Sequence, residues 1–320
     1  MLSNLIGKHK LLTLLLSFCS LAMFAQQEQD FILQTATGNI FGTLSMPAVV
    51  PDCGIDLALL VAGSGATDRN CNQPPMLMTN AFKMLADSLL QHNIATLRFD
   101  KRGIGASAAA LKSEADLRFE DYIDDVSRWV DTLAKDRNFS RIVVVGHSEG
   151  ALIGLIATLK NKKIEKYVSI AGTALPADEI LAEQLAAHPQ IFETAKPLLD
   201  TLKMGKLLVN VPPTLYALFR PSVQPYMISW MKYNPQTEIA KLTVPALALQ
   251  GTTDIQAPAK NADLLQVACP ALEKVVIENM NHVMKTCTTT EMTAQMRTYT
   301  TPDLPLADGL IKAIVDFVRK

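Results

Sequence analysis

The sequence predicts an α/β protein, in which a mostly parallel sheet is covered by helices on both faces. Two observations support this prediction. Short apolar runs alternate along the chain with longer segments whose apolar residues recur at helical spacing. The run at 57–61 is apolar throughout, which is typical of a central parallel strand and not of a half-exposed antiparallel one.

The elements are expected in a simple order. An antiparallel pair at 31–34 and 40–44, joined by a Thr-Gly-Asn turn, begins the fold. Further strands are expected at 57–61, 94–98, 141–145, 167–170, 246–249 and 274–277, and helices at 76–91, 117–136, 151–160, 258–267 and 306–318. The segment 175–241 has several helical patterns and no clear strand. We therefore expect a main body of residues 26–174 and 242–320, with 175–241 inserted as a helical cap.

Residues 1–25 have the pattern of a signal peptide. A basic segment at 8–10 precedes an apolar segment at 11–24, which is too short to cross a bilayer comfortably. Cleavage is expected after Ala25 or Ala22, and an uncleaved membrane anchor is the alternative. We expect an exported bacterial protein, periplasmic or secreted, without stable membrane insertion after cleavage.

Composition narrows the choice of partners. The 320 residues are 49% hydrophobic and carry a formal charge of -1, which suits one large globular domain and gives no indication of a nucleic-acid partner. No Cys/His spacing is typical of a metal site. Export would place four cysteines in an oxidising environment, and disulfides and buried free thiols remain alternatives for them. These are Cys53, Cys71, Cys269 and Cys287.

The segment Gly-His-Ser-Glu-Gly at 146–150 lies between an expected strand and an expected helix. In that context the motif is typical of a nucleophile elbow. Its glycines permit a tight turn, and the turn places the Ser148 hydroxyl at a helix N-terminus, where negative charge is favoured. We predict that Ser148 is the nucleophile.

Serine needs an adjacent base, and the positions of the five histidines favour His282. His147 directly precedes Ser148, so its side chain is expected to point away from the hydroxyl. His282 follows the last expected strand. Asp254 follows the preceding strand and fits the chain order Ser, Asp, His. Its predicted role is to hold the imidazole in the correct tautomer.

An oxyanion hole needs two backbone N–H donors. We expect one from Glu149, directly after the nucleophile, and one from Ser64, in the glycine-rich loop after the strand at 57–61. Nearby loops carry four charged residues that we expect to pair with one another and to fix the loop shapes, with direct substrate binding as the alternative. They are Asp68, Arg69, Asp100 and Arg102.

The cap segment is rich in large apolar residues. Tyr226 and Trp230 lie at helical spacing and are candidates for lining an acyl or aromatic pocket. Arg220 is more typical of a surface residue than of a carboxylate receptor. We therefore expect a neutral, mostly apolar substrate.

Taken together, these residues resemble the α/β-hydrolase superfamily from about residue 30 to 320, in the branch of serine-aminopeptidase-like hydrolases and bacterial carboxylesterases. The segments 63–70, 100–107 and 281–285 are similar to its oxyanion loop, its D-x-R-G-x-G-x-S loop and its histidine loop. The usual His-Gly opening of the oxyanion loop is Ala62-Gly63 here. The resemblance implies an eight-stranded, mostly parallel sheet, a helical cap and no cofactor.

The expected function is hydrolysis of small-molecule carboxylic esters through an acyl-enzyme formed by Ser148, His282 and Asp254. An aminopeptidase that uses the same triad on amides is the alternative. Such an enzyme needs an acidic group to hold the free amine, and the cap offers four carboxylates. They are Asp178, Glu179, Glu183 and Glu193. A non-catalytic binding protein is a third alternative, which the complete triad disfavours.

Overall fold

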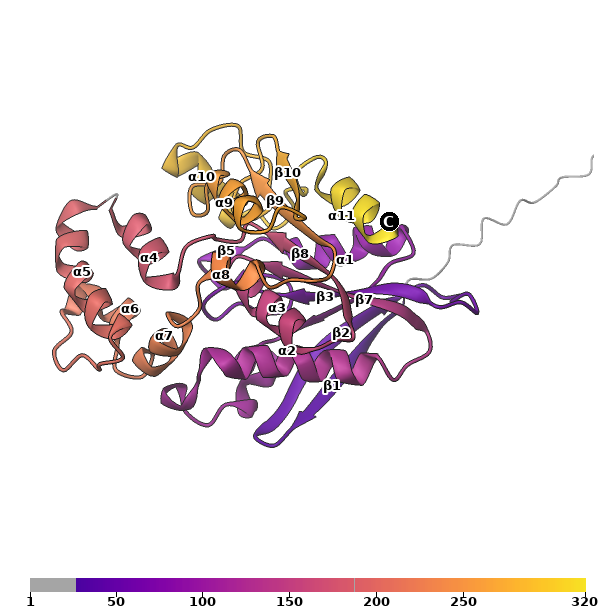
Figure 1. Cartoon of the computed structure of the whole chain (residues 1–320), viewed down its shortest axis with the longest axis horizontal. Coiled ribbons are helices and arrows are strands. Elements are labelled where there is room, and N and C mark those ends of the chain that lie inside the picture. The colour runs from indigo at the N-terminus through magenta and orange to yellow at the C-terminus, as the bar shows by residue number, and fades with distance from the viewer. Residues whose placement is uncertain (1–26, 187) are drawn as a thin grey trace, which may run out of the picture.

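The computed structural model describes residues 27–186 and 188–320, so the expected signal peptide lies outside the described residues. A central sheet has the strand order β1-β2-β6-β3-β7-β8-β9-β10 (Figure 1). These strands are β1 (Gln27–Thr35), β2 (Gly38–Met46), β3 (Ile55–Val61), β6 (Ala95–Phe99), β7 (Phe139–His147), β8 (Ile164–Ile170), β9 (Ala246–Gly251) and β10 (Glu273–Ile277). The β1–β2 and β2–β6 pairs are antiparallel, and all other neighbours are parallel. The eight-stranded, mostly parallel sheet is confirmed.

Helices cover both faces of this sheet. One face packs against α2 (Phe119–Leu133), α3 (Glu149–Lys160), α8 (Pro235–Ile239) and α9 (Lys260–Ala268), and the other against α1 (Ala81–Gln91) and α11 (Leu310–Arg319). Strand β7 shows why both faces are apolar. Ile142 and Val144 belong to the first cluster, whereas Val143 and Val145 belong to the second, because alternate side chains point to opposite faces.

The helix expected at 76–91 begins later than the sequence indicated. Residues 72–78 form a small hairpin of β4 (Asn72–Gln73) and β5 (Leu77–Met78), and α1 starts only at Ala81. The Asn72 side-chain oxygen accepts hydrogen bonds from the backbone N–H groups of Thr79 and Asn80, at 2.8 and 2.9 Å. This local bonding replaces the first helical turn that the apolar pattern predicted.

The segment between β8 and β9 is helical and largely separate from the body (Figure 1). Its helices α4 (Ala177–Leu185), α5 (Pro189–Lys203), α6 (Tyr216–Phe219) and α7 (Gln224–Trp230) share an apolar cluster of their own. Helix α7 is tied to α2, because the Ser229 hydroxyl accepts the Phe119 N–H at 2.8 Å. Helix α8 packs on α9 and α3 instead, so the last part of the expected insertion lies on the body.

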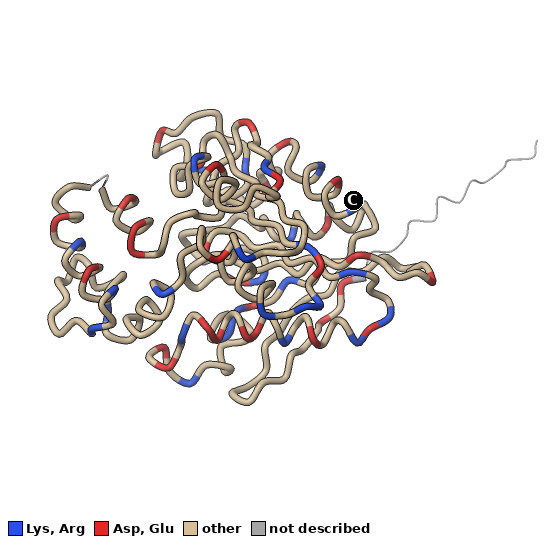
Figure 2. The backbone as a smooth tube through the Cα atoms, in the orientation of Figure 1, with Lys and Arg blue, Asp and Glu red and all other residues tan. Residues whose placement is uncertain are grey.

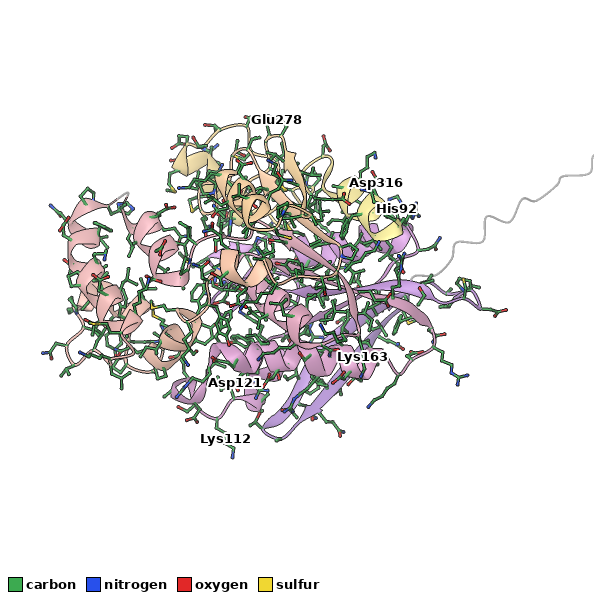
Figure 3. All side chains as sticks on the ribbon, in the orientation of Figure 1. His92, Lys112, Asp121, Lys163, Glu278 and Asp316 are labelled. Carbon is green, nitrogen blue, oxygen red and sulfur yellow. The ribbon has the colours of Figure 1, made fainter. Side chains whose placement is uncertain are left out.

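Charged residues of both signs are interspersed along the chain and do not gather in one region (Figure 2). His92 lies beside α11, and its backbone carbonyl accepts a hydrogen bond from Arg319 (Figure 3). Within the described ranges, no helix combines the length and the hydropathy that a membrane span requires.

Candidate active site

Ser148 lies in the sharp turn between β7 and α3, with a backbone φ of 55° that non-glycine residues rarely adopt. Two glycines make this turn possible. A Cβ on Gly146 would lie 2.2 Å from the Gly150 carbonyl oxygen, and one on Gly150 would lie 2.2 Å from the Val61 oxygen. The strained turn presents the half-buried serine hydroxyl at the carboxyl end of the sheet.

The structure brings Ser148, His282 and Asp254 into one hydrogen-bonded chain. His282 Nε2 lies 3.2 Å from Ser148 Oγ, and His282 Nδ1 lies 2.9 Å from Asp254 Oδ2. The buried carboxylate accepts Nδ1–H, which leaves the Nε2 lone pair for the serine proton. Asp254 is itself fixed, because its other oxygen accepts the backbone N–H groups of Gln256 and Ala257, each at 2.8 Å.

His147 does not hydrogen-bond to Ser148 but holds the loop that carries His282. Its Nε2 lies 2.7 Å from the His282 carbonyl oxygen, and the two rings are 5.0 Å apart at their centroids. Burial lowers the pKa of His147 to about 4, so at neutral pH the ring is uncharged and donates Nε2–H. His147 therefore holds the backbone of His282 and lies outside the Ser148–His282–Asp254 hydrogen-bonded chain.

The residues of the expected oxyanion donors, Ser64 and Glu149, line a common cavity with Ser148. The Ser64 carbonyl oxygen accepts hydrogen bonds from Thr67 Oγ1 at 2.7 Å and Gln73 Nε2 at 2.8 Å. In the described residues, the N–H groups of Ser64 and Glu149 form no backbone hydrogen bond outside helices and strands. Both amides are thus available to bind a developing oxyanion.

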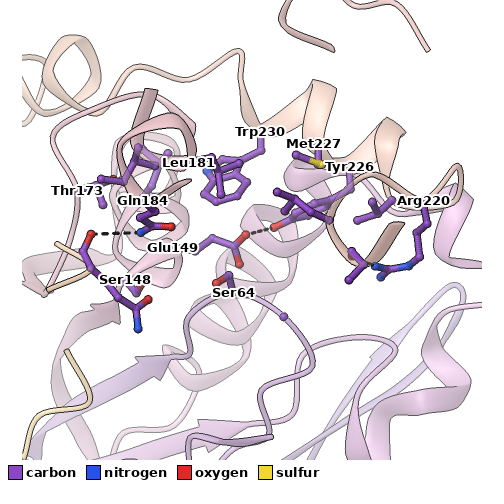
Figure 4. Close-up of a pocket in the computed structure, with 17 residues that line it drawn as sticks. Ser64, Ser148, Glu149, Thr173, Leu181, Gln184, Arg220, Tyr226, Met227 and Trp230 are labelled. Atoms are coloured by element: carbon purple, nitrogen blue, oxygen red, sulfur yellow. Dashed lines mark hydrogen bonds between the residues drawn. The ribbon is translucent and has the colours of Figure 1, made fainter. Parts of the chain in front are cut away.

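The Glu149 side chain belongs to a buried polar network beside the nucleophile. Tyr226 donates its hydroxyl to Glu149 Oε1 at 2.7 Å, as Figure 4 shows. Lys101 Nζ lies 3.3 Å from Glu149 Oε2, and only 1% of the lysine side chain and 3% of the glutamate side chain is exposed. Burial and the neighbouring carboxylate raise the pKa of Tyr226 well above its ordinary value, which keeps its hydroxyl protonated.

The charged loop residues pair only partly as expected. Arg69 forms an ion pair with Asp100 at 2.8 Å. Arg102 instead pairs with Asp125 on α2, at 2.9 Å from its Nε atom. Asp68 accepts backbone N–H groups of its own loop. The sequence pattern could not identify Asp125 because that partner lies on a helix 23 residues away.

A cavity of about 300 Å³, here named the cap cavity, lies between Ser148 and helices α4, α6 and α7. Both sequence candidates, Tyr226 and Trp230, line it (Figure 4). Much of its wall is aliphatic or sulfur-containing, with Leu152, Ile180, Leu181, Leu218, Val223 and Met227. Arg220 also lines it, but its guanidinium is paired with Glu114.

A second cavity of about 270 Å³, here named the loop cavity, is also lined by Ser148. Loops of the body and helix α10 (Met292–Tyr299) form its walls. It is lined by His282 and His147 and by Cys71, Met76, Leu77, Val283, Met296 and Tyr299. Ser148 therefore borders two partly open cavities of similar size.

The four cysteines of the described chain are free thiols, which resolves the alternatives that the sequence left open. Cys53 is exposed, and the other three are buried. Burial raises the pKa of the Cys71 thiol to about 12, so it lines the loop cavity as a neutral group. Across the ranges that the structure describes, no cluster of three or more His, Cys, Asp or Glu side chains could hold a metal ion.

Sequence reasoning missed several residues of the site. Gln184 on α4 donates to the Gln256 carbonyl at 3.2 Å and so links the cap to the loop of Asp254 (Figure 4). Met296 reaches the loop cavity from a helix that the sequence pattern did not indicate. Lys101 lies in the loop at 100–107, whose sequence pattern pointed to Asp100 and Arg102 but not to the lysine between them.

Fold and site together define an α/β-hydrolase. The chain belongs to the Hydrolase_4 family (Serine aminopeptidase, S33), whose family model matches residues 78–285.

Esterase EstD from Thermotoga maritima is 27% identical over 266 residues. That match covers 81% of this chain, and the chain spans 60% of the length of this curated relative.

The fold is similar to solved esterases. Est1E from Butyrivibrio proteoclasticus, solved with ferulic acid, has a TM-score of 0.58 at 15% identity, with 90% of this chain and 96% of that chain covered. Esterase EaEST from Exiguobacterium antarcticum has a TM-score of 0.56 at 16% identity, covering 91% and 100%.

Proposed function

We propose that this protein is an exported serine carboxylesterase that uses Ser148, His282 and Asp254. The observation that carries the proposal is the hydrogen-bonded chain of these three residues at the junction of two largely apolar cavities. The esterase names of the curated relative and of the structural neighbours support it.

The geometry supports a two-step reaction. Ser148 Oγ attacks the acyl carbon while its proton passes to His282 Nε2, and the N–H groups of Ser64 and Glu149 bind the oxyanion. The tetrahedral intermediate then breaks its C–O bond to the leaving group, and His282 returns the proton to the departing alcohol. A water molecule, deprotonated by His282, attacks the acyl-enzyme and releases the carboxylic acid and free Ser148.

This chemistry assigns one half of the ester to each cavity. The leaving oxygen must lie within reach of the general acid, His282. His282 lines the loop cavity and is absent from the walls of the cap cavity. We therefore infer that the alcohol half occupies the loop cavity and the acyl half occupies the cap cavity.

The cap cavity favours esters over aminoacyl substrates. Three of the four cap acids pair with lysines, Asp178 and Glu179 with Lys203 and Glu183 with Lys260. The fourth, Glu193, does not line this cavity. Glu149 is the acidic residue that lines this cavity, and its two oxygens are engaged by Lys101 and Tyr226. An ammonium group entering the cavity would find no free carboxylate among the lining residues and would lose its hydration.

The decisive experiment is turnover of nitrophenyl esters of graded acyl length beside aminoacyl-nitroanilides, with Ser148→Ala as the control. We expect ester hydrolysis that peaks at one acyl length and falls about 10⁴-fold in the variant. Faster cleavage of the anilides would favour the aminopeptidase. Equal activity of Ser148→Ala would exclude this triad.

Export is a separate part of the proposal and rests on the signal-peptide pattern at 1–25. Expression of the full chain in a Gram-negative host should give a periplasmic or secreted protein that begins after Ala22 or Ala25. Intact Met1 on cytoplasmic protein would contradict export and would leave the esterase assignment standing.

A further inference from the structure

Lys101 is a buried cation beside the nucleophile that the reaction above does not use. Its Nζ donates to the Gly63 carbonyl oxygen at 2.6 Å and to Glu149 Oε2 at 3.3 Å. The same ammonium lies 4.8 Å from the centroid of the Tyr122 ring. A buried lysine is costly unless its donors are engaged, so these contacts define a built site.

The contact with Gly63 acts on an oxyanion donor. The Gly63 carbonyl and the Ser64 N–H belong to one planar peptide, in which the C=O and N–H bonds point in opposite directions. An ammonium that holds the carbonyl therefore also fixes the direction of the N–H. It withdraws electron density from the peptide and makes that N–H a stronger donor.

The contact with Glu149 links Lys101 to the second donor. Glu149 supplies its own N–H to the oxyanion hole, while its carboxylate binds the ammonium. Tyr226, on cap helix α7, holds the other carboxylate oxygen at 2.7 Å. Without Lys101, an uncompensated carboxylate would lie beside the site where negative charge develops.

We propose that Lys101 is a positioning residue that fixes the Gly63–Ser64 peptide for oxyanion binding and, through Glu149 and Tyr226, connects that peptide to the cap. The proposal rests on the proposed esterase function. It predicts an effect on the transition state and little effect on ground-state binding, because the lysine lines neither cavity.

The first test is Lys101→Met, which roughly keeps the length of the side chain and removes the ammonium. We expect kcat on nitrophenyl esters to fall about 10- to 100-fold, less than or equal to the loss of a whole oxyanion donor. KM should stay within about threefold. Affinity for a trifluoromethyl ketone, which forms a tetrahedral adduct with Ser148, should fall in parallel with kcat. An unchanged kcat would overturn the proposal.

Charge balance and peptide positioning are separated by Glu149→Gln and the double variant Lys101→Met/Glu149→Gln. The double variant has no unpaired carboxylate but still lacks the donor to Gly63. We expect it to remain about tenfold or more below the unaltered protein, and Glu149→Gln alone to lose less than Lys101→Met. Recovery of full kcat in the double variant would show that Lys101 only neutralises Glu149.

Lys166→Met is the matched control. Lys166 is also a buried lysine, which donates to the Phe317 and Val318 carbonyls at 2.9 and 3.0 Å. It lies on β8 away from the oxyanion loop, so its replacement should lower the melting temperature without changing kcat per active site. Active sites are counted by fluorophosphonate labelling of Ser148.

A second pair of variants keeps the proposal testable if Lys101→Met does not fold. Lys101→Arg retains charge and donors, and Lys101→Gln retains a donor without charge. Lys101→Arg should be faster than Lys101→Gln, and a kcat of Lys101→Gln equal to that of the unaltered protein would overturn the proposal. Absence of Ser148-dependent turnover in the unaltered protein would instead contradict the esterase assignment itself.

Discussion

The two cavities beside Ser148 differ in the parts of the chain that build them. The cap cavity takes most of its lining residues from the segment between β8 and β9, whereas the loop cavity is lined by residues of the body, including α10. Ser64, Ser148 and Gln256 line both. The proposed nucleophile therefore borders both cavities, whereas most of their other lining residues come from different segments of the chain.

This difference separates three kinds of perturbation. A change in the shared triad should slow all esters alike. A change in one cavity should alter selectivity for one half of the ester and leave the other half unaffected. A change at His147, which holds the His282 backbone, should alter the pH dependence of stability, because burial lowers the pKa of its ring.

The largest effect is expected from Asp254→Asn. Loss of the carboxylate leaves His282 without the acceptor that fixes its tautomer, so kcat should fall about 10³- to 10⁴-fold. Rates measured across both the acyl and the alcohol series should fall by the same factor, with unchanged preferences. A change in preference would mean that Asp254 also shapes a cavity, and a loss below about tenfold would remove it from the triad.

The next effect concerns stability at acid pH. The pKa of His147 is lowered by burial to about 4 in the folded chain, against about 6.5 when exposed. Its neutral form therefore contributes stability above pH 6.5, and this contribution is lost as pH falls towards 4, by up to about 3 kcal/mol. The free energy of unfolding, measured by urea titration from pH 7.5 to 4, should decline less steeply for His147→Gln.

His92→Gln is the control for this measurement, because His92 is exposed and lies beside α11. The free energy of unfolding of His92→Gln should depend on pH as that of the unaltered protein does. Parallel curves for all three proteins would show that His147 is not the group that takes up the proton on unfolding.

A smaller, selective effect is expected from Trp230→Ala. Trp230 lines the cap cavity and stacks on Phe119 at 6.1 Å between ring centroids. Its removal should lengthen the preferred acyl chain and change the ratio of kcat/KM for long and short acyl esters by about tenfold. Tyr233→Ala is the control, since Tyr233 also packs on Phe119 at 5.4 Å but does not line the cavity. A changed alcohol preference would reverse the assignment of the cavities.

The sequence predicted the body better than the cavities, and the reason is physical. The elbow at 146–150 and the loops of Asp254 and His282 are short segments whose positions follow from the strands before them, since parallel strands end at one edge. Because β7, β8, β9 and β10 are neighbours in the sheet, the loops that follow β7, β9 and β10 lie close together.

Contacts between distant helices and loops leave no such local pattern. Lys101 meets Glu149 across 48 residues, and Gln184 meets Gln256 across 72. The start of the helix expected at 76–91 was wrong for a related reason, because the bonds of the Asn72 side chain override a favourable apolar spacing before Ala81. Apolar residues of the cap were recognised, but whether each packs inward or lines a cavity depends on how the helices cross.

The most selective test of the comparison is Met296→Trp. Met296 is 41% exposed and lines the loop cavity from α10, so a larger ring should reduce the space for the alcohol half. Hydrolysis of naphthyl esters should fall about tenfold relative to ethyl esters of the same acid, because overpacking excludes the larger group. Met292→Trp, on the same helix and outside the cavity, should leave this ratio unchanged. If the acyl preference changed instead, the proton from His282 would have to reach a leaving group in the cap cavity, which the positions of the triad atoms disfavour.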